Sequence, residues 1–210
     1  MLDIPYVPNT GNSCALSCYT MAAKYFFPET SFEDLAKVTR HVPKYVIWEM
    51  PFWNWIMDRG ITVTSYSTID YGLWAEEGTD GLKKMVGEKE FEYYQANTYD
   101  LESYTEDISE NLANPLFVHM DRNPTWGDLL AEFAQGAVCN IVLNFKALDR
   151  EDGFALHQVV VLDITDEYIE FHDPRTHSTP RPNRRESYDH FRYAWLETVD
   201  NPSLCTYKKV

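Results

Sequence analysis

The spacing of apolar residues predicts helices in the first third of the chain. From residue 13 to residue 26 apolar residues occur nearly all round the expected helix, which is typical of a helix that is buried on all sides. The segment 31–38 opens with a serine and two acids, so it predicts a capped second helix. An aromatic-rich third helix is expected at 48–59, where a glycine ends it. Alternating residues at 61–66 then predict a strand.

The last third has a different pattern, because continuous apolar runs replace the helical spacing. We expect a helix at 126–134, strands at 137–145, 156–163 and 168–171, and a short closing helix at 187–196. Pro174 ends the third strand, since proline cannot continue a hydrogen-bonded ladder. Helices followed by strands are typical of an α+β fold.

The segment 71–124 does not fit this order. Its helical stretches are short, and acids and tyrosines dominate it. Tyrosine combines contact area with a polar tip, which suits a surface that covers a binding cleft. We therefore interpret 71–124 as an insertion or lid within a single domain that covers 1–210. An arginine-rich run at 175–192 would either face its acids or form a separate solvated surface.

The overall charge excludes one class of partner. The chain has 18 Lys and Arg against 33 Asp and Glu, a net charge of −15 at pH 7. Such an acidic surface repels phosphate backbones, so we expect no nucleic-acid partner. No apolar run is long enough to span a membrane, and the first residues contain no apolar signal core. These features predict a cytoplasmic protein without a membrane partner.

Four cysteines do not form a recognisable disulfide or zinc pattern. Cys14 and Cys18 are four residues apart with no matching second pair, and Cys139 stands in an apolar strand. A zinc site that used His172 and His177 is the metal-dependent alternative. The main interpretation requires no metal and no cofactor.

The candidate chemistry is that of a nucleophilic thiol. Cys14 stands in the first turn of the buried helix, where the helix dipole and free amide groups stabilise a thiolate. His157 opens an apolar strand, and Asp173 ends the next one. A hairpin centred on Thr165 would set His157 opposite Asp173 on one face, with its Nδ1 toward the carboxylate. The sequence therefore suggests a Cys–His–Asp constellation.

Three motifs carry a resemblance to a known family. Residues 5–8 read Pro-Tyr-Val-Pro and a polar loop then leads to Cys-Ala-Leu-Ser at 14–17. Residues 153–161 contain His-Gln-Val-Val-Val, and 169–174 end in Asp-Pro. In order and spacing these motifs resemble the C39-like peptidases of the papain-like cysteine protease superfamily, over nearly the whole chain except 71–124. The resemblance implies a papain-like fold, with an N-terminal helical half packed on a C-terminal antiparallel sheet.

The resemblance also implies roles for single residues. Cys14 would be the nucleophile, His157 the general base and acid, and Asp173 the group that orients the histidine. No glutamine precedes the cysteine, so the side-chain amide of Asn9 or Asn12 would help to hold the oxyanion. The expected substrate is a peptide or small amide, cleaved by a peptidase or amidase. The alternatives are an acyltransferase with the same triad, and a binding module on a fold that has lost its activity.

Overall fold

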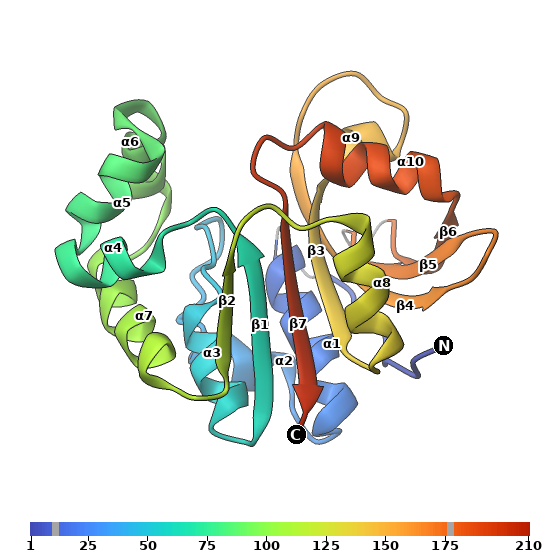
Figure 1. Ribbon diagram of the computed structural model, residues 1–210, viewed down its shortest axis with the longest axis horizontal. Helices are drawn as coiled ribbons and strands as arrows, with labels where there is room; N and C mark the ends of the chain where they lie inside the picture. Colours follow the sequence, from blue (N-terminus) through green and yellow to red (C-terminus); the bar gives the residue numbers. More distant parts are fainter. Residues whose placement is uncertain (10–12, 176–178) are drawn as a thin grey trace.

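A seven-stranded sheet runs through the described part of the chain, residues 1–9, 13–175 and 179–210 of this computed structural model (Figure 1). The strand order is β2-β1-β7-β3-β4-β5-β6. The strands are β1 (Ile61–Ser67), β2 (Phe117–Asp121), β3 (Val138–Asn144), β4 (Leu156–Ile164), β5 (Ile169–Asp173), β6 (Arg181–Glu186) and β7 (Ser203–Lys209).

Helices cover both faces of this sheet (Figure 1). One face carries α1 (Cys14–Phe26), α2 (Phe32–Val38) and α3 (Met50–Met57). The other face carries α8 (Trp126–Ala134), α9 (Phe145–Leu148), α10 (Tyr188–Arg192) and a π-helical turn at Tyr193–Glu197. Beyond the β2 edge lie α4 (Tyr71–Glu77), α5 (Thr79–Val86), α6 (Glu88–Asn97), a 3₁₀ turn at Leu101–Ser103 and α7 (Tyr104–Ala113).

The expected mixture of helices and strands is confirmed, but the sheet is not purely antiparallel. β1 and β2 pair in parallel, because the helices between them return the chain to the same end of the sheet before β2 begins. β1 lies in the first half of the chain, so that half is not only helical. Each face of the sheet buries its own apolar core, which makes the fold a three-layered α/β arrangement.

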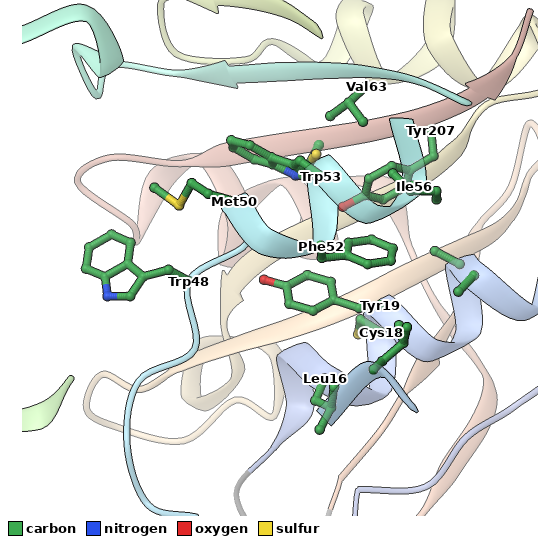
Figure 2. Close-up of a cluster of buried hydrophobic side chains, with 14 of the residues drawn as sticks. Leu16, Cys18, Tyr19, Trp48, Met50, Phe52, Trp53, Ile56, Val63 and Tyr207 are labelled. Atoms are coloured by element: carbon green, nitrogen blue, oxygen red, sulfur yellow. The ribbon is translucent and has the colours of Figure 1, made fainter. Parts of the chain in front are cut away.

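The larger core lies between the sheet and α1 to α3 (Figure 2). Tyr19 of α1 stacks on Phe52 of α3 at a ring-centroid distance of 4.8 Å, and Tyr207 of β7 meets Phe52 edge-on. Trp53 is completely buried nearby. Side chains of the 71–124 segment, among them Trp74, belong to this same core. The all-round apolar pattern of α1 is thus explained by its position under the sheet.

The predicted β4–β5 hairpin is present, but the predicted register of its strands is wrong. Val161 pairs with Phe171 rather than with Ile169, because the turn is formed by the residues between Thr165 and Tyr168. The register also shifts by one residue between Val161 and Asp163. At Val161 the observed register differs from the predicted one by two residues. A displacement of two residues keeps each side chain on the same face of the sheet, so His157 and Asp173 still share a face.

A row of polar side chains crosses the sheet beneath α1 and α3. His119 of β2 is registered with Ser65 of β1, Ser65 with Cys205 of β7, and Cys205 with Asn140 of β3. Asn140 is 2% exposed, and neither atom of its amide has a hydrogen-bond partner within the described residues.

Within the described residues, no helix is both long and apolar enough to cross a membrane.

Candidate active site

Cys14 is the first residue of α1, and the residue as a whole is partly exposed. The loop before it is tied to the helix: the Asn9 Oδ1 accepts a hydrogen bond from the Ser13 N–H at 2.8 Å. Ser17, one turn into the helix, donates its hydroxyl to the Pro8 carbonyl at 3.3 Å. These contacts fix the start of α1, so the thiol lies where the helix dipole and the free amide groups act on it.

His157 and Asp173 form a buried pair at the ends of two neighbouring strands. The His157 Nε2 lies 2.7 Å from the Asp173 Oδ1. His157 is 8% exposed, and Asp173 is fully buried. The expected pair is therefore present, but through Nε2 and not through the predicted Nδ1. The ring reaches along the strand from a position diagonal to Asp173, which brings its far nitrogen to the carboxylate and leaves Nδ1 for the thiol.

The thiol and the imidazole are hydrogen-bonded to each other, and each changes the charge of the other. Burial raises the pKa of the Cys14 thiol, but the hydrogen bond and charge of His157 outweigh it and leave that pKa below its usual value. Burial lowers the pKa of His157, whereas its bonds to Asp173 and Cys14 raise it to about 9. Both shifts favour a thiolate beside an imidazolium, which is the reactive form of a nucleophilic cysteine.

The second carboxylate oxygen of Asp173 is held by arginines. Arg184 of β6 donates from Nη1 to the Asp173 Oδ2 at 3.0 Å, and Arg175 donates from Nε at 3.2 Å. Burial raises the pKa of Asp173, but His157 and these cations leave it below its usual value. The Tyr6 hydroxyl donates to the Asp173 backbone carbonyl at 3.3 Å. Asp173 is therefore a fixed anion.

The oxyanion residues remain a prediction. Asn9 is 4% exposed and lies four residues before Ser13, where its side-chain oxygen receives the Ser13 N–H. This bond orients the whole amide group at the entrance to α1. Asn12, the alternative, lies outside the described residues.

The other candidate residues are not part of this cluster. Cys18 and Cys139 are buried, and burial raises the pKa of both thiols. The His172 Nε2 lies 2.9 Å from the Ile4 carbonyl, and its Nδ1 accepts the Asn183 N–H at 3.3 Å. Both of its ring nitrogens are thus engaged with backbone. His177 lies outside the described residues, and within them no group of three potential metal ligands gathers.

The arginine-rich run pairs differently from the expectation that it could face the acids of 71–124. Among the described residues, the carboxylate partners of Arg175, Arg181, Arg184 and Arg185 are Asp149, Asp173, Glu170 and Glu186. These acids follow β3 or belong to β5 and β6, so the arginines connect neighbouring segments of one end of the sheet. The hydrogen bonds of the 71–124 segment run instead to residues such as Val46, Trp48 and Asn54. The lid role of 71–124 stays a prediction.

Two functional positions were missed in the sequence. Arg184, which contacts the Asp173 carboxylate, lies in a polar run whose pattern is not typical of a strand. Asn144, the last residue of β3, accepts the N–H groups of Lys146 and Ala155 and donates to the Gly153 carbonyl at 3.3 Å. It thereby holds the loop that leads into His157. An asparagine directly before a short helix is a capping signal that could have identified it.

Comparisons with known proteins do not assign this chain. Neither the models of protein families nor the curated proteins give a significant match to it.

Proposed function

We propose that this protein is a cysteine-dependent peptidase or amidase with a papain-like arrangement, in which Cys14, His157 and Asp173 form the triad. One observation carries the proposal. The thiol at the first residue of α1 is hydrogen-bonded to a histidine whose other nitrogen lies 2.7 Å from a buried carboxylate. A nucleophile, a base and an orienting group in this sequence of contacts are what acyl chemistry requires.

The reaction divides into two steps. The Cys14 thiolate attacks the carbonyl carbon of a peptide or amide and forms a C–S bond, while the carbonyl oxygen becomes an oxyanion. His157 then gives its proton to the leaving amine as the C–N bond breaks. In the second step His157 takes a proton from water, whose oxygen attacks the thioester. The C–S bond breaks, and the thiolate and the protonated imidazole are restored.

Asp173 and Asn9 support these steps without bonding to the substrate carbon. The Asp173 carboxylate holds the His157 ring and stabilises its charged form. The Asn9 amide and the start of α1 would stabilise the oxyanion.

The four cysteines are unpaired, which favours a reducing compartment such as the cytoplasm.

Trapping an acyl-enzyme tests the proposal. The protein is incubated with a library of peptides and small amides, and the Cys14-containing peptide is analysed by mass spectrometry. We expect an acyl adduct on Cys14 that disappears as the free acid is formed. Cys18→Ala should retain the adduct, whereas Cys14→Ala and His157→Gln should not form it.

The same experiment separates the alternatives. A product joined to an added amine, in place of the free acid, identifies an acyltransferase on the same triad. A library member that is retained without an adduct identifies a binding module. If iodoacetamide modifies Cys14 no faster at pH 7 than it modifies a small free thiol, the proposal of an activated nucleophile is wrong.

A further inference from the structure

The acidic member of the triad is part of a larger buried charge cluster. Asp173 is fully buried, and the side chains of Arg184 and Asp149 beside it are also almost inaccessible to solvent. Their side chains are 9% and 8% exposed. Charges buried to this degree are costly unless every one is paired. The three residues of the triad alone do not explain why these additional charges are buried beside Asp173.

Arg184 is the centre of this cluster. Its Nη1 donates to the Asp173 Oδ2 at 3.0 Å and to the Asp149 Oδ1 at 2.8 Å. Its Nη2 donates to the Leu148 carbonyl at 2.9 Å and to the Glu186 Oε1 at 2.8 Å. The guanidinium is thus fixed from three sides, and it presents one N–H group to the carboxylate of the triad.

Cations surround the carboxylates near Asp173. Three carboxylates, of Asp149, Asp173 and Glu186, meet the guanidinium groups of Arg175, Arg181 and Arg184, and the exposed Arg150 also reaches Glu186 at 3.4 Å. Arg175 and Arg181 also pair with Asp149, at 2.5 Å and 3.0 Å. Because Arg175 and Arg184 contact the Asp173 Oδ2, His157 meets a carboxylate whose charge is already compensated on its far side.

We propose that Arg184 is a positioning residue of this site: it holds the Asp173 Oδ2 so that Oδ1 faces His157, and together with Asp149 it sets the net charge against which His157 and Cys14 ionise. This inference rests on the proposed function, since it assigns a second layer to the same triad. Arg184 touches neither the thiol nor the imidazole, so it acts only through Asp173.

Two substitutions of opposite charge test this role. Arg184→Met removes a cation next to Asp173, so the extra negative charge favours the imidazolium and disfavours the thiolate. Asp149→Asn removes an anion from the same cluster at almost constant shape, so both effects reverse. A merely structural role would change stability in both variants, but it would not shift the ionisation of His157 in opposite directions.

The measurement uses two readouts. The rate of Cys14 alkylation by iodoacetamide against pH reports the acid limb, where the thiolate forms. Titration of the His157 ring by nuclear magnetic resonance, assigned with His157→Gln, reports the imidazolium. In Arg184→Met we expect both midpoints to rise by about one pH unit, the size of shift that a close charge causes. In Asp149→Asn we expect both to fall, by about half a unit because the charge is one contact further away.

Arg185→Gln is the matched control. Arg185 is the next residue of β6, and its Nε pairs with the buried Glu170 at 2.5 Å. Its loss removes an ion pair from the same strand without changing the charge at Asp173, so both midpoints should stay in place. If Arg184→Met does not fold, Asp149→Asn alone decides, because an unchanged or raised His157 midpoint in that variant overturns the proposal.

The two readouts also separate this inference from the proposed function. A wild-type Cys14 that alkylates like a free thiol refutes the activated nucleophile, and the histidine titration still tests Arg184. A reactive Cys14 with unshifted histidine midpoints in both variants refutes only the role of Arg184.

Discussion

His157 contacts Asp173 across a diagonal of the sheet. Val161 is registered with Phe171, so the position in β4 that continues this register opposite Asp173 is Val159. His157 stands two residues nearer the start of the strand, yet its Nε2 reaches the carboxylate at 2.7 Å. The ring therefore lies along the strand, and its second nitrogen is directed toward the beginning of α1 and the thiol.

Removing the thiol should abolish activity without unfolding the protein. In Cys14→Ala we expect no acyl-enzyme and no turnover, because no other described thiol contacts the imidazole. The fold should remain, since Cys14 is partly exposed and the change removes one sulfur. Turnover and a thermal melt measure the two properties.

Cys18→Ala in the same helix is the control for this substitution. Cys18 is completely buried, so its truncation leaves a small cavity and should cost about 1 kcal/mol of unfolding free energy. Activity should persist at temperatures where the variant is folded. An active Cys14→Ala together with an inactive Cys18→Ala would show that the nucleophile is assigned to the wrong turn of the helix.

Asn9→Asp tests the oxyanion role apart from the structural one. Aspartate keeps an oxygen that can accept the Ser13 N–H, but it cannot donate to an oxyanion. We expect turnover to fall by about 100-fold, the typical effect of losing one such donor. The maximal rate of alkylation by iodoacetamide, reached where the thiol is fully ionised, should change little because that reaction forms no oxyanion. Equal losses in both reactions would instead indicate a damaged nucleophile.

Glu49→Gln should stabilise the protein in alkaline but not in acidic solution. Burial beside the sheet raises the pKa of Glu49 to about 7, although the Tyr19 hydroxyl donates to its Oε2 at 3.3 Å. In the unfolded chain the pKa of a glutamate is about 4.3. Between about pH 4 and pH 7 the native state therefore holds a proton on Glu49 that the unfolded state has lost. The free energy of unfolding falls as the pH rises through this range. The substitution removes this loss, on the order of 3 kcal/mol at pH 8.

Denaturant unfolding at pH 4 and pH 8 measures the difference. Glu29→Gln, a change at an exposed position, is the control and should have little effect at either pH. An equal effect of Glu49→Gln at both pH values would contradict a buried carboxyl that ionises late.

Asn140→Leu should raise stability, because the side chain is buried and its amide lacks partners within the described residues. Leucine has a similar shape and no polar atoms to desolvate, so we expect a gain of about 1–2 kcal/mol in unfolding free energy. Asn144→Leu, on the same strand, is the comparison variant. Its amide makes two hydrogen bonds to the loop before His157 and one to the Lys146 N–H, and their loss should destabilise the fold. A stability loss in Asn140→Leu would mean that its amide is satisfied by bound water.

The sequence predicted strongly periodic elements well and polar strands poorly. The helix at Cys14–Phe26 and the strand at Leu156–Ile164 have clear apolar patterns, and both were expected. The strands at Phe117–Asp121, Arg181–Glu186 and Ser203–Lys209 were missed. The first two lie at the edges of the sheet, where polar residues meet solvent. The third ends in two lysines, and its central position depends on partners far away in the sequence.

The site shows the same limit at the level of single contacts. The pairing of His157 with Asp173 was predictable, because side chains alternate between faces and a displacement of two residues keeps the face. The atom that makes the contact was not, since it depends on the bulge near Asp163. The place of Arg184 was also hidden, because arginines in a polar run give no pattern that distinguishes a buried residue from an exposed one.

The position of β7 has a consequence for how the protein is made. This strand, the last of the seven to be synthesised, lies between β1 and β3 within the sheet (Figure 1). Until it is synthesised, β1 and β2 cannot join the strands that carry His157 and Asp173. During translation the strands on the two sides of β7 can therefore form only separate partial sheets. The unpaired backbone groups at the edges of these sheets are prone to aggregation.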